Sequence, residues 1–444
     1  MGTHRGSRGF ERGFQFFQKV YAPPLTALSL NALIAVFAGY LFVIVASQKL
    51  LPDLAIYVHA SEAFKAGKNI YSEPYQIELP DGKLARLPYL YPPLLAHLLS
   101  KGVDLEYPTI KFIWCLISFL AIVGSVVNLT KLLAHSWWRD VSHRTRLLIV
   151  TFFTLCFEPL SAGVGYGQVT ALILFLLSAF MLASVRRHEF VAGLALALAI
   201  HIKITPIVLL VAPLLFHRWR IVLWSLVNML ALTLVTVVDT GSTDVFVDFL
   251  RGIPLAADYP GLRENVFNLS VVLNLAQVLG LPAVKVSQLL IRIVLLLGIL
   301  GGTLSMRRRD EQDYLAMVGF LIVGMMLISP IMWFHHLAWL LLPITVASMR
   351  PTSTTNERLA ILTTALGILF GLDKVLLLHI TMMKQAPGLV HFSALLPGIL
   401  LMWLGFTLWN GWCLSPVQDN PCARLFTSVI ISNDTKKRAD TQLP

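Results

Sequence analysis

A few polar side chains interrupt an otherwise apolar sequence, and their types suit the transfer of a group carried on a phosphate. Asp53 directly follows the first long apolar run, where a carboxylate at the membrane boundary is costly unless it is used or paired. We therefore predict that Asp53 is a catalytic base. Lys203 lies at a turn between apolar runs, where a lysine suits a phosphate. His335 and His336 follow a later apolar run and are candidates to contact a phosphate or a sugar hydroxyl.

These residues also allow other interpretations. Asp53 would serve equally as the N-cap of a helix that starts beside it. Lys203 would extend its ammonium group to the lipid headgroups, as cations at the ends of membrane helices do. His335 and His336 are adjacent, so on a helix they point in different directions and make a poor metal pair. We predict no metal site.

Four more polar residues are candidates for substrate binding, and they are Tyr91, Gln168, His201 and Asn268. Tyr91 opens a rigid Tyr-Pro-Pro strip, which is also typical of an interfacial aromatic belt. Gln168 ends a glycine-rich stretch, residues 163–168, that lacks the strand of a nucleotide-binding loop. Small residues there favour close helix packing, and amides at the start of the next helix would also suit an anion.

The composition places these residues in a membrane protein. The chain has 444 residues, of which 56% are apolar and 13% charged, whereas soluble domains carry about 25% charged residues. The net charge of +11 comes from basic residues in short loops between apolar runs, which indicates the positive-inside rule rather than nucleic-acid binding. The four cysteines are scattered and form neither a disulfide framework nor a zinc-binding pattern.

The apolar runs predict an all-α, polytopic membrane protein in three parts. Residues 1–24 form a basic cytoplasmic N-terminus, residues 25–410 one membrane domain, and residues 411–444 a cytoplasmic tail. The run lengths predict about twelve helices in the membrane domain. The first apolar run, Leu25–Ser47, is too long for a cleaved signal and is expected to stay as an anchor.

Residues 50–106 are expected to form a loop on the non-cytoplasmic side. It would contain an interfacial helix, Asp53–Lys65, and a short apolar piece, Leu94–Leu99, that cannot cross a membrane. The second span, Pro108–Leu133, returns to the cytoplasm. All the candidate residues then fall on the non-cytoplasmic side, and we predict one polar cavity that opens outward, because polar backbone at this depth needs burial or a cavity.

A secondary transporter would also have charged residues and broken helices at membrane depth. Two features argue against it. The polar positions gather at one face rather than at the midplane, and the sequence shows no obvious repeat.

Taken in order, the polar positions resemble glycosyltransferase family 87, whose GT-C-fold members include polyprenyl-phosphate-mannose-dependent α-mannosyltransferases. The similarity runs from about residue 25 to residue 343. At two positions the chain departs from the family, with Thr170 where an Asn is frequent and Leu269 where a Gln is frequent. The residues that carry the resemblance are Asp53, Gly67 with Tyr71, Tyr91-Pro92-Pro93, Gly167-Gln168, Lys203 with Pro206, Asn268 with Ser270, and Ser329-Pro330 with Trp333 and His336.

This resemblance implies a GT-C-type helical bundle that transfers a sugar, with mannose favoured, from a polyprenyl phosphate to a lipid- or glycan-linked acceptor. The donor would arrive through the lipid, and no cofactor is expected. Asp53 would act as the base, Lys203 and His336 would stabilise the departing phosphate, and the sugar would be inverted. The site would face the non-cytoplasmic side of the cell membrane. Other GT-C enzymes, such as arabinosyl- or aminoarabinosyltransferases or a polysaccharide ligase, remain as alternatives.

Overall fold

The computed structural model describes residues 51–258, 268–279 and 285–349, except residues 73, 79–83, 307 and 309. It also describes positions 35, 38, 39, 43, 399–402, 404 and 405. The predicted first span, the final hairpin with its Asp373-Lys374 pair, and the tail therefore lie largely or wholly outside the described residues. The predicted total of about twelve helices stays a prediction.

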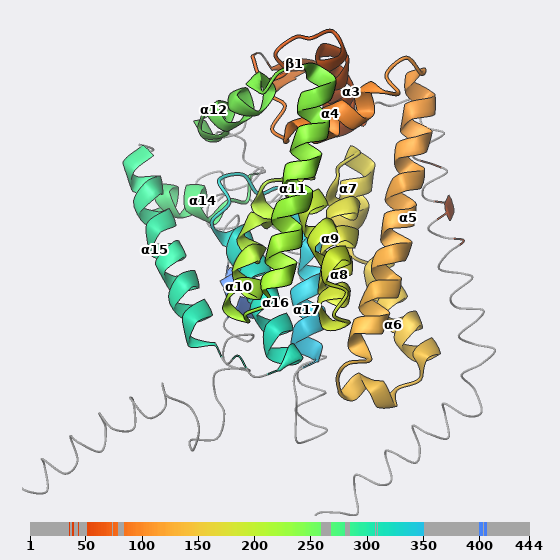
Figure 1. The fold of residues 1–444 in the computed structure, drawn as a ribbon, viewed down its shortest axis with the longest axis vertical. Helices are drawn as coiled ribbons and strands as arrows, with labels where there is room; N and C mark the ends of the chain where they lie inside the picture. The colour runs from red at the N-terminus through yellow and green to blue at the C-terminus, as the bar shows by residue number, and fades with distance from the viewer. Residues whose placement is uncertain are drawn as a thin grey trace, which may run out of the picture.

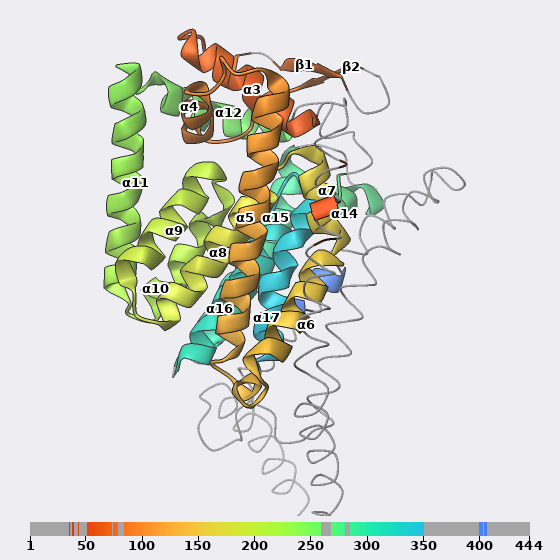
Figure 2. The same ribbon diagram turned by 90° about the vertical axis from the view of Figure 1, so that its right-hand side faces the viewer.

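A layer of short elements lies across one end of a bundle of upright helices (Figures 1 and 2). The layer consists of α3 (Pro52–Lys65), the antiparallel strands β1 (Tyr75–Glu78) and β2 (Leu84–Leu87), α4 (Pro93–Ser100) and α12 (Asp244–Asp258). The predicted interfacial helix and the predicted short apolar piece correspond to α3 and α4. The small hairpin was not predicted.

The bundle contains the remaining elements. They are α5 (Tyr107–Leu133), η1 (Trp137–Asp140), α6 (His143–Leu155), α7 (Glu158–Tyr166), α8 (Thr170–Val185), α9 (Glu189–Ile202), η2 (Thr205–Leu210), α10 (Val211–Leu215), α11 (Trp219–Thr240), α14 (Val271–Val278), α15 (Lys285–Ser305), α16 (Glu311–Leu327), η3 (Phe334–Leu340) and α17 (Leu341–Ser348). The predicted second span matches α5 to within one residue. Apart from the hairpin, every regular element in the described ranges is helical, which confirms the all-α prediction.

Three helices in the described part of the chain are long and apolar enough to cross a membrane, namely α5, α11 and the Gln288–Ser305 part of α15. The pair α6 and α7, bent by 57° at its break, would make a fourth. α11 and α15 bury little of their apolar surface within the protein. Such a surface is stable in lipid but not in water, which supports a multi-pass membrane protein.

Helix α3 begins at Pro52, and its N-cap is Leu51, whose side chain forms no capping hydrogen bond. Proline suits this position because the first amides of a helix have no intrahelical partner. Asp53 therefore lies inside the first turn, and the explanation of Asp53 as an N-cap is wrong. At the other end of α3, Lys65 forms an ion pair with Asp104 at 2.5 Å.

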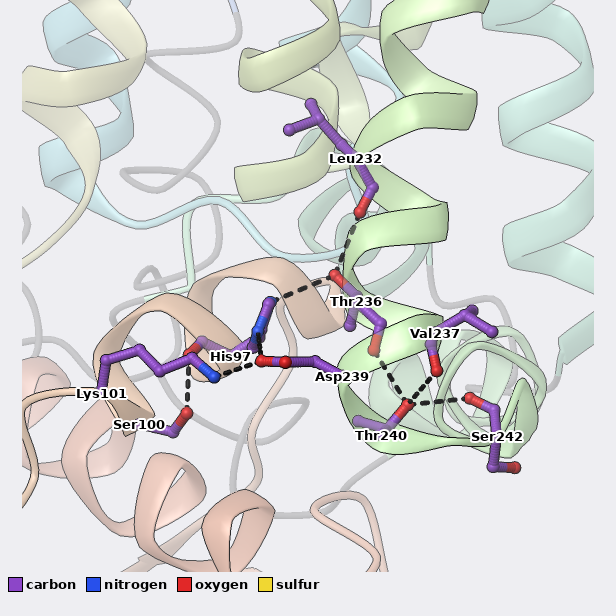
Figure 3. A network of polar contacts seen from close by, with 9 residues as sticks. All are labelled: His97, Ser100, Lys101, Leu232, Thr236, Val237, Asp239, Thr240 and Ser242. Atoms are coloured by element: carbon purple, nitrogen blue, oxygen red, sulfur yellow. Dashed lines mark hydrogen bonds and ion pairs between the residues drawn. The ribbon is translucent and has the colours of Figure 1, made fainter.

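A polar network attaches the outer layer to α11 (Figure 3). His97 of α4 is buried, and its Nε2 lies 2.6 Å from Oδ2 of Asp239 on α11. The His97 Nδ1 lies 3.4 Å from the Thr236 hydroxyl, and Lys101 forms an ion pair with the same Asp239 oxygen. We call these four residues the α4–α11 network. It fixes α4, and with it the Tyr-Pro-Pro strip that precedes α4, against a membrane helix.

Candidate active site

The turn between α7 and α8 passes directly beneath α3 because it contains a glycine. Gly167 has φ of +74°, a conformation that other residues rarely adopt. A Cβ on Gly167 would lie 2.8 Å from the Cβ of Leu54 and 2.9 Å from the Cβ of Leu51. Glycine is therefore required both for the turn and for the close approach to α3. This approach brings Gln168 under the face of α3 that carries Asp53.

Gln168 joins three segments of the chain. Its Oε1 accepts hydrogen bonds from the Tyr57 hydroxyl at 3.1 Å and from the Tyr91 hydroxyl at 2.9 Å. Its side chain also hydrogen-bonds the Asp53 carboxylate. Asp53 and Tyr57 are four residues apart on α3, so they share one face of the helix and both reach Gln168.

Lys203 enters this cluster from the end of α9. The helix stops at Ile202, and Lys203 has extended backbone with φ of −148° and ψ of 122°. Its Nζ lies 5.7 Å from the centre of the Tyr91 ring and 5.1 Å from that of Trp339. These distances suit cation–π attraction. Lys203 is only partly exposed, and two aromatic rings hold its ammonium group in place.

The Lys203 Nζ lies 2.7 Å from Nε2 of His336, which is buried at the start of η3. The Nδ1 of His336 accepts the backbone N–H of Trp333 at 3.2 Å, so the proton of a neutral ring resides on Nε2. An ammonium group has only donors. A charged Lys203 and the His336 N–H are therefore both donors, and an oxyanion beside this pair would accept from both.

The electrostatics of Asp53 suit a base that works near neutral pH. Burial raises its pKa from 3.8 to about 7, although the Gln168 hydrogen bond and the charge of Lys203 both lower it. The side chain is partly buried rather than sealed from its surroundings. A catalytic base is most effective when its pKa lies near the working pH.

The structure thus brings together five of the predicted residues. Asp53, Gln168 and Tyr91 are linked through hydrogen bonds, and Lys203 and His336 lie beside them. The segments that carry them span residues 53–336 of the chain, and all five were predicted to gather around one polar cavity.

His335 lies at the edge of this cluster. Its buried ring packs against His336, with centroids 4.6 Å apart, and against Tyr166 at 5.9 Å. Its Nε2 has no hydrogen-bond partner among the residues that the structure describes. The substrate-binding role of His335 stays a prediction.

Two predicted residues face elsewhere. His201 lies between α9 and α11, where its Nδ1 is 3.1 Å from the Ala197 carbonyl and its Nε2 is 3.1 Å from the Thr233 hydroxyl. The Oδ1 of Asn268 accepts the backbone N–H groups of Ser270 at 3.1 Å and Met332 at 3.0 Å. Asn268 thereby connects the start of α14 to the loop before η3, which carries the histidine pair.

Sequence reasoning missed two residues of the cluster. Tyr57 was not singled out, although its spacing of four from Asp53 on a predicted helix was a usable signal. Trp339 lies three residues after His336, and its ring stacks on the His336 ring with centroids 5.4 Å apart. Nothing in the sequence alone separated it from an ordinary apolar position.

The fold and the cluster define a multi-pass membrane protein with an acid facing a pair of phosphate-compatible donors. The sequence profile of glycosyltransferase family 87 matches residues 89–330, more than half of the chain. The protein belongs to glycosyltransferase family 87, and it is a membrane glycosyltransferase. The transporter alternative is therefore excluded.

Two curated relatives come from Mycobacterium tuberculosis. The polyprenol-phosphate-mannose-dependent alpha-(1-2)-phosphatidylinositol mannoside mannosyltransferase is 28% identical over 327 residues, which are 70% of this chain and 74% of the relative. The corresponding pentamannoside mannosyltransferase is 25% identical over 294 residues, which are 65% of this chain and 64% of the relative. Among solved structures, ArnT from Cupriavidus metallidurans bound to undecaprenyl phosphate matches with a TM-score of 0.41 and 15% identity, over 86% of this chain and 77% of ArnT.

Proposed function

We propose that the protein transfers mannose from polyprenyl-phosphate mannose to a hydroxyl group of a glycolipid or glycan, with inversion at the sugar. The proposal is supported by the relatives, which are named as mannosyltransferases dependent on polyprenol-phosphate-mannose. The observation that carries it is the Asp53 carboxylate beside two facing donors, Lys203 Nζ and His336 Nε2.

Asp53 suits the removal of the acceptor proton, and the Lys203–His336 pair suits the charge that grows on the leaving phosphate. The acceptor oxygen attacks the anomeric carbon and gives its proton to Asp53, while the bond from that carbon to the phosphate oxygen breaks. The electron pair leaves with the polyprenyl phosphate, whose growing negative charge lies beside the Lys203 and His336 donors. Attack from the face opposite to the phosphate inverts the anomeric centre. Charge stabilisation of this kind is often the largest contribution to catalysis.

One carboxylate is enough for this reaction. Glycosidases need a second carboxyl group because their leaving group is an alkoxide that must be protonated. A phosphate ester leaves as a stable anion, so a cation and an N–H group replace the acid. Lys203 and His336 supply them.

The active site faces the non-cytoplasmic side in this proposal. Helix α8 begins beside Gln168 and ends at Val185, next to Arg186 and Arg187. Arg218 also lies at that end, where it donates to the Ser184 carbonyl at 2.9 Å. Short loops rich in arginine stay in the cytoplasm, so the opposite end of α8, with the site, faces outward.

The test is mannose transfer by the full-length protein purified in detergent, with polyprenyl-phosphate mannose as donor and phosphatidylinositol mannoside as acceptor probe. Asp53→Asn should lower kcat by about 10²–10⁴-fold, the usual contribution of a general base. The matched control is Glu158→Gln, the same change at an exposed carboxylate in the first turn of α7, which should keep its activity. Near-normal turnover by Asp53→Asn would refute the assignment of the base.

The same assay tests the choice of sugar. Polyprenyl-phosphate arabinose and polyprenyl-phosphate aminoarabinose are compared with the mannose donor in parallel reactions. Preferential transfer of either sugar would replace mannose in the proposal and leave the role of Asp53 unchanged.

A further inference from the structure

We propose that Gln168 is a positioning residue for the base rather than a contact for the substrate, and that Tyr57 and Tyr91 lock its amide so that the N–H side faces Asp53. The inference rests on the proposed function, in which Asp53 takes the acceptor proton. It assigns a role to two tyrosine hydroxyl groups and one amide of the same site.

The hydrogen bonds of Gln168 leave its amide one useful direction. A carboxamide oxygen has two lone pairs. The Tyr57 and Tyr91 hydroxyls both reach this oxygen, at 3.1 Å and 2.9 Å. The side chain is only 3% exposed, so water cannot replace these partners freely. The NH₂ group of the Gln168 amide then remains as a donor, and the Asp53 carboxylate is the acceptor beside it.

The opposite orientation of the amide would couple to the protonation of Asp53. A flipped Gln168 would present its oxygen to the carboxylate, and two acceptors repel each other unless Asp53 carries a proton. Each orientation of the amide therefore favours one form of Asp53. The two tyrosines select the orientation that favours the ionised, catalytically competent form.

The tyrosines are themselves held in place. Their rings meet edge to face, with centroids 4.9 Å apart and an interplanar angle of 81°. The backbone carbonyl of Tyr91 accepts the Tyr71 hydroxyl at 2.8 Å. Tyr57 is fully buried on α3. The lock on Gln168 is thus built from two supported side chains on separate segments.

Among the residues that the structure describes, four groups that titrate interact electrostatically with Asp53. Tyr57 comes from α3 itself, Tyr91 precedes α4, Tyr166 ends α7, and Lys203 ends α9. Of these, Lys203 supplies the opposite charge and the tyrosines are neutral near pH 7. Lys203 and Gln168 therefore both help to keep Asp53 ionised, and only Gln168 depends on the tyrosine hydroxyl groups.

The test follows Asp53 directly, without substrate. Carbodiimides modify protonated carboxyl groups, so the pH at which Asp53 labelling is half-maximal, read by mass spectrometry on the full-length protein in detergent, reports its pKa. For the unaltered protein this midpoint is expected at about 7. Gln168→Met should move it upward by roughly one pH unit, the size of one hydrogen bond to a charged group.

The paired variant Tyr57→Phe with Tyr91→Phe keeps Gln168 but releases its amide, and it should raise the midpoint in the same direction. Each single variant leaves one tyrosine in place and should shift it less. The matched control is Tyr314→Phe, which removes a buried hydroxyl bonded to Ser184 at the other end of α8. It should leave the midpoint unchanged.

Two results would overturn the inference. One is an unchanged midpoint in both Gln168→Met and the double tyrosine variant. The other is a raised KM for the donor in Gln168→Met without any shift of the midpoint, which would make Gln168 a substrate contact. The proposed function fails separately, through transfer activity that survives Asp53→Asn, so the two failures are distinguishable.

Discussion

Two polar clusters connect the outer layer to the bundle, and they differ in how completely their groups are matched. In the α4–α11 network, the Asp239 carboxylate lies within hydrogen-bond distance of both His97 and Lys101, so both of these side chains have an acceptor (Figure 3). In the cluster around Asp53, the two donors of Lys203 and His336 face each other at 2.7 Å. The first cluster is complete by itself, whereas the second would be completed by an anion.

The difference separates attachment from catalysis. A buried polar group without a complement costs stability, so it persists where it has another use. The α4–α11 network holds α4, while in the proposed function the Asp53 cluster keeps groups ready for a substrate. Helix α11 serves both, because its Thr233 contacts His201 near the end of α9 and its Asp239 contacts His97 of α4. It thereby sets the spacing between Lys203 and Tyr91.

The largest effect is expected when one lysine of each cluster is replaced. Lys203→Met keeps the apolar stem but removes the charge beside the leaving phosphate, and it should lower kcat/KM for the donor by about 10²–10³-fold. Lys101→Met makes the same change in the α4–α11 network and should cost less than about threefold, because exposed ion pairs contribute little. Transfer rates at varied donor concentration give kcat/KM for both variants. Equal losses would mean that Lys203 is structural.

Two of the three left-handed glycines among the described residues, Gly167 and Gly241, distinguish the effect of backbone strain from that of close approach. Gly167→Ala adds an unfavourable backbone conformation and a clash with α3, and it should lower transfer at least tenfold by moving Gln168 away from Asp53. Gly241→Ala, at the end of α11, has a similar φ of +68° but nothing within 4 Å of the added Cβ. It should cost about 1 kcal/mol of stability through strain alone. Activity and thermal unfolding distinguish them, and similar losses of transfer would contradict the close approach.

The pH dependence of transfer tests whether Asp53 governs the acid limb. Because burial raises its pKa to about 7, the carboxyl group becomes protonated, and inactive as a base, as the pH falls through that value. Transfer should then decline about tenfold for each further pH unit. A limb near pH 4 would mean that the base is solvated like an ordinary aspartate.

The smallest effect is expected from Asp239→Asn. The change removes the ion pair with Lys101 but keeps a side chain that can hydrogen-bond His97. Asp239 is 46% exposed, so solvent screens its charge. We expect a slightly lower melting temperature, activity within about twofold, and an acid limb at the same pH. A shifted limb would show that the two clusters are electrostatically coupled.

Much of the outer layer could be predicted from local sequence. The apolar run and the proline before Asp53 placed α3 to within one residue, and the length of the next run placed α5 equally well. The sidedness of the loops put Asp53, Lys203 and His336 on the same face of the membrane. The sequence also predicted that these residues gather around one cavity, and the structure places them in one cluster.

The sequence by itself determined the extents of α3 and α5, because run length is a local quantity, and loop charge predicted the side on which each polar residue falls. Only the tertiary structure decided the rotation of each helix about its axis. That rotation turned His201 towards α11, made Asn268 a link between two loops, and brought Tyr57 and Trp339 to the acid and the lysine. Helix rotation depends on packing against neighbours that are distant in the chain, and apolar runs with a weak periodicity do not encode it locally.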